Sequence, residues 1–189
     1  HHRHSGERLS TALASVSHHR GTGMKLLRYG PKGREKPGIL DKAGKIRDLS
    51  KVIPDITGET ISPKGLAKLR KLKLESLPLV RGKPRIGACI ANPQKFIAIG
   101  LNYSDHAKEA GMPIPAEPIV FMKATTCISG PNDGVIQPKR STKLDWEIEL
   151  AAVIGRKARN VSVAKALDYV AGYTIANDVS ARDLGRRAG

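Results

Sequence analysis

The sequence LDWEIELAAVIG, residues 144–155, decides how the rest of the chain is interpreted. Its apolar and β-branched content predicts a strand, in which successive side chains point to opposite faces of the sheet. This alternation puts Glu147 and Glu149 on one face. The neighbouring apolar side chains point the other way, where we expect an apolar layer: Trp146, Ile148 and Leu150.

Two carboxylates on one strand face suggest a cation site. Carboxylates held about 4 Å apart repel each other by about 4 kcal/mol at an effective dielectric constant near 20. A hard divalent cation with oxygen ligands, such as Mg²⁺, Mn²⁺ or Ca²⁺, removes that repulsion. The alternative is an exposed strand face on which Glu147 and Glu149 are only solvated. A further isolated carboxylate, Asp178, follows in the segment TIANDVSARD.

A second cluster of polar residues lies in LNYSDHAKEAG, residues 101–111. The segment predicts a helix from about Tyr103 to Ala110 that ends at a glycine. His106 and Glu109 are three residues apart and share a helix face, so the carboxylate can orient the imidazole as a general base for water. An exposed helix with an incidental pair is the alternative. Lys123, in an otherwise apolar strand segment, either extends to solvent or holds an anionic substrate.

Charge and composition exclude several classes of protein. The net charge is +16, and most of the excess lies before residue 84, around an amphipathic helix with a basic face. Aromatic residues make up only 4% and no nucleic-acid motif is present, so we expect attraction to anions but no specific nucleic-acid binding. No apolar run reaches the roughly 20 residues that span a bilayer. The two cysteines have no metal-ligand spacing, which argues against structural zinc. Two are also too few for the disulfide scaffold of a small secreted protein, so we expect a reducing compartment, the cytoplasm.

Changes in composition and hydrophobic pattern along the sequence predict four regions. We expect a disordered leader or non-native extension over residues 1–23, a small N-terminal α+β domain over 24–83, a linker over 84–94, and the N-terminal part of a catalytic domain over 95–189. Because no terminating strand or cap is visible after Asp183, we expect the chain to be a fragment.

Within the second region we predict an antiparallel meander, then a helix that starts at Ser62-Pro63 and ends near Lys73. In the fourth region the pattern predicts a helix at about 163–169 and five strands: 96–100, 119–123, 134–137, 144–154 and 170–176.

Five motifs in this order resemble the fumarylacetoacetate hydrolase family: G-L-N-Y-x-D-H-x-x-E-x-G, P-x-x-F-M-K, G-P-x-D-x-V, D-W-E-x-E-L-x-x-V-I-G and N-D-V-S-x-R-D. The resemblance covers Met24 to about Leu184. It implies an α+β fold with a β-rich mixed β-roll catalytic domain, here incomplete, behind a small N-terminal cap domain. It also implies a homodimer.

The same resemblance implies roles for individual residues. Mg²⁺ or Mn²⁺ is held by three carboxylates, which match Glu147, Glu149 and Asp178. A catalytic dyad on a mobile helix matches His106 and Glu109. A substrate-contacting lysine matches Lys123, and Tyr103, one turn before His106 on the same helix face, is our second expected substrate contact. The family commonly has a glutamine two residues after the last aspartate of N-D-V-S-x-R-D, where this chain has Gly185.

These assignments predict a Mg²⁺-dependent hydrolase that cleaves a C–C bond of a 2,4-dioxo acid, an acylpyruvate or a 2,4-diketo-3-deoxy sugar acid, through a metal-stabilised enolate. The start MKLLRYG, residues 24–30, resembles the branch often labelled ureidoglycolate lyase. That activity, oxaloacetate decarboxylation and 2-hydroxyhepta-2,4-diene-1,7-dioate isomerisation are alternatives on the same scaffold. An inactive fragment, or a basic module that binds polyanions through residues 64–73, is the alternative of another class.

Overall fold

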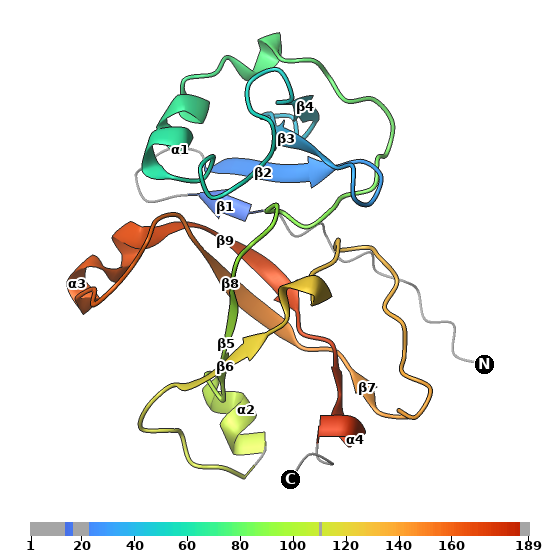
Figure 1. Cartoon of the computed structure of the whole chain (residues 1–189), viewed down its shortest axis with the longest axis vertical. Helices are drawn as coiled ribbons and strands as arrows, with labels where there is room; N and C mark the ends of the chain where they lie inside the picture. Colours follow the sequence, from blue (N-terminus) through green and yellow to red (C-terminus); the bar gives the residue numbers. More distant parts are fainter. Residues whose placement is uncertain (1–13, 17–22, 110, 186–189) are drawn as a thin grey trace. The chain divides into compact units, whose positions relative to one another are not determined.

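The computed structural model describes residues 14–16, 23–109 and 111–185 (Figure 1). Contacts divide the chain into two units, one of residues 1–91 with 129–189 and one of residues 92–128. The first unit contains strands β1 (Ala14–Val16), β2 (Met24–Tyr29), β3 (Lys36–Leu40), β4 (Ile46–Asp48), β7 (Leu144–Asp145), β8 (Ile148–Ile154), β9 (Val170–Asn177) and β10 (Ser180–Ala181). Its helices are α1 (Pro63–Arg70), α3 (Val163–Ala166), α4 (Arg182–Gly185) and the 3₁₀ turns η1 (Leu74–Ser76) and η3 (Leu167–Tyr169).

Six of these strands form one antiparallel sheet in the order β4-β3-β2-β1-β9-β8, so the sheet joins strands from distant parts of the chain. The predicted meander is confirmed as β2, β3 and β4. Its second turn is set by Asp41, whose Oδ1 accepts hydrogen bonds from the N–H groups of Ala43 and Lys45, and by Gly44 with φ 73°. Of the expected leader, only Ala14–Val16 and Gly23 are described. The three residues Ala14–Val16 form β1, and the rest lies outside the described residues.

Helix α1 begins as the sequence predicts. Ser62 is the N-cap, its Oγ accepts the N–H of Gly65 at 3.1 Å, and Pro63 takes the first helical position. The helix ends at Arg70, three residues earlier than predicted, because Lys71 and Leu72 form tighter hydrogen bonds to residues three before them.

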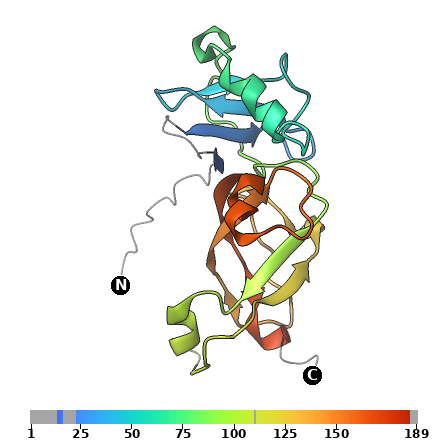
Figure 2. The same cartoon turned by 90° about the vertical axis from the view of Figure 1, so that its left-hand side faces the viewer.

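The core lies between α1 and the sheet, and Figure 2 shows the helix against the strands (teal over blue). The cluster includes Leu26, Ile39, Leu66 and Leu69, and it also includes Ala171 of β9. The expected catalytic part of the chain therefore contributes a strand to the core of the expected N-terminal domain.

Residues 85–87 lie beside the end of β2 and are hydrogen-bonded to it and to the residue after it. The backbone N–H of Gly30 donates to the oxygen of Arg85, and that of Gly87 donates to the oxygen of Arg28, both at 2.8 Å. The predicted domain boundaries at 83/84 and 94/95 stay predictions. Along the chain, the two units meet instead after residues 91 and 128.

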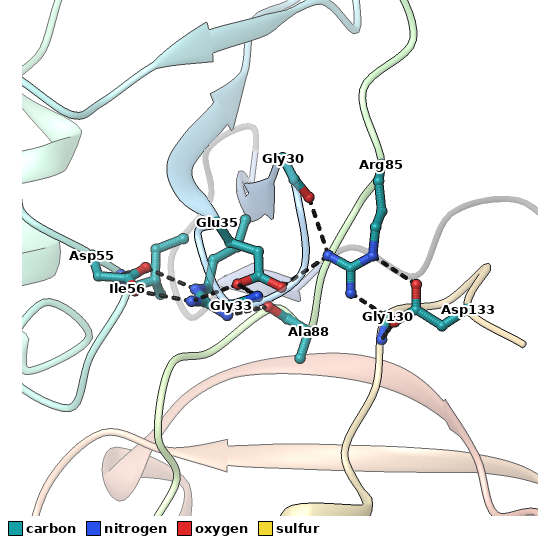
Figure 3. A network of polar contacts seen from close by, with 10 residues as sticks. Gly30, Gly33, Glu35, Asp55, Ile56, Arg85, Ala88, Gly130 and Asp133 are labelled. Atoms are coloured by element: carbon teal, nitrogen blue, oxygen red, sulfur yellow. Dashed lines mark hydrogen bonds and ion pairs between the residues drawn. The ribbon is translucent and has the colours of Figure 1, made fainter. Parts of the chain in front are cut away.

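Arg85 joins three parts of the first unit (Figure 3). Its guanidinium makes a two-pronged ion pair with Asp133, with Nε–Oδ1 and Nη2–Oδ2 distances of 2.7 and 2.6 Å. The remaining nitrogen, Nη1, donates to Glu35 at 2.8 Å and to the carbonyl of Gly30 at 3.1 Å. Paired hydrogen bonds of this kind between guanidinium and carboxylate are about twice as strong as neutral ones. We call Arg85, Glu35 and Asp133 the Arg85 clamp.

The clamp fixes the turn Gly130–Gly134, which leads into residues 135–143. Asp133 also accepts the N–H of Gly130 at 2.8 Å. Gly130 lies so close to residues 86 and 87 that a Cβ there would overlap the carbonyl oxygen of Ile86. The hydrogen bonds from Arg85 and from Gly130 hold the pKa of Asp133 at about 2, below its ordinary value of 3.8.

The structure differs from the expected strands at two places. Residues 134–137 form no strand, and the Gln137 side chain instead donates to the carbonyl of Ser141 at 2.7 Å. The strand expected over 144–154 is interrupted at Trp146 and Glu147. There, side chains replace ladder partners: Asp145 Oδ1 accepts the N–H of Trp146, and Asn177 Oδ1 accepts that of Glu147.

The second unit, residues 92–128, contains β5 (Phe96–Gly100), α2 (Ser104–Glu109), β6 (Ile119–Lys123) and the 3₁₀ turn η2 (Thr125–Cys127). Strands β5 and β6 pair antiparallel, with Phe96 opposite Lys123 and Gly100 opposite Ile119. Both strands and the helix between them agree with the sequence-based expectation.

Because the pKa of Asp133 is lowered in the folded protein, the clamp should make the stability of the protein depend on pH in the acid range. A group with a lowered folded-state pKa contributes stability above its ordinary pKa and loses it as the pH falls through the folded value. For Asp133 that window runs from about pH 4 to about pH 2. We expect Asp133→Asn to lower the free energy of unfolding by about 2 kcal/mol at pH 7, and by much less at pH 2.

Denaturant unfolding at several pH values, followed by circular dichroism, measures this difference. Glu117→Gln, which removes an exposed carboxyl outside the clamp, is the control and should change little. A deficit for Asp133→Asn that is the same at pH 7 and pH 2 would contradict this account of the clamp.

Candidate functional site

The three predicted carboxylates lie where β8 meets β9. Ile148 lies opposite Asn177 in the main sheet, and Asp145 lies opposite Ser180 in the β7–β10 pair. These two pairs belong to one continuous antiparallel register, so Glu147 stands opposite Asp178. The N–H of Asp178 donates to the oxygen of Glu147 at 2.8 Å, as this register requires.

The register decides which residues share a face. Because side chains alternate along each strand and opposite residues point to the same side, Glu147, Glu149 and Asp178 belong to one face. Asp145 and Arg182 belong to the same face by the same rule, since the N–H of Arg182 donates to the oxygen of Lys143 at 2.9 Å. We call the side of the β7–β8 and β9–β10 strands that carries these five residues the carboxylate face.

The opposite face is apolar and open. Trp146 is 73% exposed, and Ile148 and Leu150 are each 65% exposed. The alternation that the sequence predicts is therefore present, but the expected burial of these three side chains is wrong. Among the described residues nothing covers them to the extent that a core position requires.

Arg182 pairs with two carboxylates of the carboxylate face. Its Nε lies 3.0 Å from Oδ2 of Asp145, and its Nη2 lies 3.0 Å from Oε1 of Glu147. These hydrogen bonds, first to Asp145 and then to Glu147, raise the pKa of the guanidinium, which keeps its charge at every relevant pH. Sequence reasoning missed both Asp145 and Arg182, although the spacing Asp145-x-Glu147-x-Glu149 already places all three acids on one face.

The side chains as they stand do not surround a cation. Within residues 14–16, 23–109 and 111–185, no group of three His, Cys, Asp or Glu side chains has the arrangement that holds a metal ion. The fit to a hard cation therefore rests on the all-oxygen donor chemistry and on the shared register of Glu147, Glu149 and Asp178. The assignment of these residues as metal ligands stays a prediction.

The second unit carries the predicted dyad and the predicted substrate contacts. His106 and Glu109 both lie exposed on α2, which Gly111 ends with φ 64°. In the part of the chain that the structure describes, no hydrogen bond or ion pair joins these two side chains. Tyr103, just before α2, is 43% exposed. Their roles stay predictions.

Strand β6 shows an inverted pattern of exposure. Its apolar residues are exposed, whereas Lys123 is the one residue of β6 that is partly buried. A lysine in the least exposed position of an apolar strand is unusual, because its ammonium is expensive to desolvate. Immediately after β5, Leu101 has φ 48°, a left-handed conformation that branched side chains seldom adopt.

The sequence of this chain is similar to that of a known protein family. Residues 95–189 match the family model described as the fumarylacetoacetate (FAA) hydrolase C-terminal domain. The chain belongs to the fumarylacetoacetate hydrolase family. The family resemblance seen in the five sequence motifs is thereby confirmed.

Relatives and solved structures of the family agree with this assignment. A protein of Burkholderia cenocepacia, whose provisional name is hydrolase, is 63% identical over 160 residues, which cover 85% of this chain and 57% of that protein. The fumarylacetoacetate hydrolase of Exiguobacterium antarcticum superposes with a TM-score of 0.67 at 30% identity, covering 87% of this chain and 58% of that one. A probable 2-hydroxyhepta-2,4-diene-1,7-dioate isomerase of Mycobacterium abscessus gives 0.66 at 35% identity, covering 87% and 55%.

These similarities confirm the α+β class, and they support an enzyme at the level of the family, whose members carry both hydrolase and isomerase names. The chain spans a little over half the length of the curated relatives that it matches. Within the described residues, no helix is both long and apolar enough to cross a membrane.

Proposed function

We propose that this chain is part of a Mg²⁺-dependent, or Mn²⁺-dependent, hydrolase that cleaves a C–C bond of a 2,4-dioxo acid such as an acylpyruvate or a 2,4-diketo-3-deoxy sugar acid. The observation that carries the proposal is the continuous register from Leu144 to Val153 against Gly172 to Ala181. It gathers the acids of two separate segments on the carboxylate face, within a chain of this family.

Glu147, Glu149 and Asp178 are the proposed ligands of the cation. Three carboxylates offer only oxygen atoms, which Mg²⁺ and Mn²⁺ prefer. When bound, the cation would supply positive charge to the oxygens of a 2-oxo acid. The role of the protein is to hold three negative groups on one face of a strand pair, so that binding of the cation requires their side chains, but not the backbone, to rearrange.

His106 is the proposed general base, oriented by Glu109. Their three-residue spacing places them one turn apart on α2, and the exposure of both gives water access to the imidazole. The proton taken from water would rest on a ring nitrogen of His106, and Glu109 would stabilise the resulting imidazolium. Lys123 and Tyr103 are the proposed contacts for the anionic and polar groups of the substrate.

We also propose that the sheet belongs to a mixed β-roll, which this chain contains in part, and that residues 24–83 serve as its cap. The antiparallel strands on both sides of β1 support this. A homodimer and a cytoplasmic location complete the proposal. Sedimentation equilibrium would test the first, with an expected mass of twice 20.4 kDa.

An isomerase is the second candidate, because similar solved structures from mycobacteria carry 2-hydroxyhepta-2,4-diene-1,7-dioate isomerase names. Assay of an acylpyruvate beside 2-hydroxyhepta-2,4-diene-1,7-dioate separates the two. Ureidoglycolate lyase and oxaloacetate decarboxylase activities belong in the same panel. Salt-sensitive retention on a polyanion, unchanged by loss of the carboxylates, would instead favour a binding module.

Metal binding can be tested without any substrate. We expect calorimetric titration with MgCl₂ or MnCl₂ to give one site per chain, and Glu149→Gln to weaken it at least about tenfold, because a charged oxygen ligand becomes neutral. Glu117→Gln is the matched control, since it removes an exposed carboxyl from the other unit. Equal affinities for the two variants would reject the carboxylate face as the metal site.

The role of His106 predicts a defect in rate. We expect His106→Asn to lower the turnover of an acylpyruvate in the presence of Mg²⁺ by about 10²-fold, as the loss of a general base does. The calorimetric affinity for Mg²⁺ should stay the same. Asp105→Asn, a neighbour on α2, serves as the control, and an unchanged rate for His106→Asn removes this residue from the mechanism.

A further inference from the structure

Arg182 holds a carboxylate that the proposed function assigns to the metal. Its guanidinium bridges Asp145 and Glu147, with both N–O distances at 3.0 Å. Glu147, one of the three proposed ligands, is thus paired with a cation that the protein itself supplies.

The position of Arg182 is fixed by its backbone and by its neighbour. Its N–H donates to the oxygen of Lys143, which continues the register of β7 and β10. The next residue, Asp183, accepts hydrogen bonds from Ser141 Oγ at 2.7 Å and from the N–H of Thr142 at 3.0 Å. Ser141 is buried, so its hydrogen bond to Asp183 is partly shielded from water, whereas that of Thr142 is exposed. Arg182 therefore starts α4 at a defined place, from which its side chain reaches back along the carboxylate face.

A guanidinium and a divalent cation compete for the same carboxylate. Glu147 has two oxygens, one of which accepts from Arg182, and a second positive charge beside the guanidinium is repelled by it. Asp145 offers Arg182 a second anchor that is not among the proposed ligands. The guanidinium can therefore leave Glu147 while it keeps its contact with Asp145.

The exposure of the pair makes such an exchange feasible. The side chain of Arg182 is 43% exposed and that of Glu147 is 24% exposed. Ion pairs at this level of exposure are weak and are screened by salt, in contrast to a buried pair that would block the site.

We propose that Arg182 is a cation placeholder: its guanidinium neutralises Glu147 in the metal-free protein and gives it up when a divalent cation binds, while remaining paired with Asp145. This inference rests on the proposed metal site and adds a residue that sets the affinity of that site. It makes Arg182 a positioning residue, which acts on the metal through Glu147.

The test compares Mg²⁺ affinities of the 189-residue chain by calorimetry. We expect Arg182→Gln to tighten binding about fivefold, the scale of an exposed ion pair. Arg182→Lys, which keeps the charge but loses the fork of two donors, should lie between Arg182→Gln and the unchanged chain. Lys143→Gln is the matched control, because it removes a positive charge from the same face without touching Glu147. It should change the affinity less than twofold.

A second readout follows Arg182 directly. In an NMR titration with MgCl₂, the Arg182 Nη2 resonance should shift with the same midpoint as the calorimetric curve, because Nη2 loses its contact with Glu147, whereas the Nε–H resonance should shift less, because Nε stays paired with Asp145. Circular dichroism of each variant checks that the fold is retained.

The outcomes separate this inference from the proposed function. Binding that tightens equally in Arg182→Gln and Lys143→Gln reflects only the general charge and overturns the placeholder role. Binding that weakens in Arg182→Gln overturns it too, because Arg182 would then assist the metal. If neither the unchanged chain nor any variant binds Mg²⁺ or Mn²⁺, the proposed metal site fails together with the inference.

Discussion

One antiparallel register determines what the carboxylate face contains. It runs unbroken from the β7–β10 pair into the β8–β9 pair, although the strand itself is interrupted at Trp146 and Glu147. A shift of one residue between the two strands would turn Asp178 and Arg182 to the face opposite Glu147 and Glu149. Two hydrogen bonds hold the register through the interruption: the N–H of Asp178 donates to the carbonyl oxygen of Glu147, and the N–H of Glu147 donates to Oδ1 of Asn177.

Local pattern was enough to predict the elements and part of the site. Period-two alternation identified the face of Glu147 and Glu149, and the Ser62-Pro63 pair identified the start of α1. The break at Glu147 was not predictable from the strand, because its cause is the side chain of Asn177, thirty residues away. The open apolar face also escaped prediction. Hydrophobicity indicates which residues prefer burial, but not whether the described part of the chain supplies a cover.

Contacts across long sequence separations were the main limit. Arg85 looked like one basic residue in a Pro- and Gly-rich stretch, yet its partners Glu35 and Asp133 are about fifty residues away in opposite directions. Likewise, nothing around Arg182 in the sequence indicates that it reaches Glu147. The metal-ligand role of Asp178 came from the family motifs, whereas the His106–Glu109 pair followed from its helical spacing. No spacing rule alone joins those residues to the glutamates.

The Arg85 clamp also affects how the chain could be dissected. A protease cut within residues 84–94, where the sequence suggests a linker, would not release two independent pieces. The first fragment would still hold Asp133 of the second through Arg85, if the cut lay beyond it, and Ala171 of the second would still fill the core beneath α1. Nicked chains should therefore co-migrate under native conditions and separate only in denaturant. Expression of residues 24–83 alone would leave an unfilled core where β9 belongs.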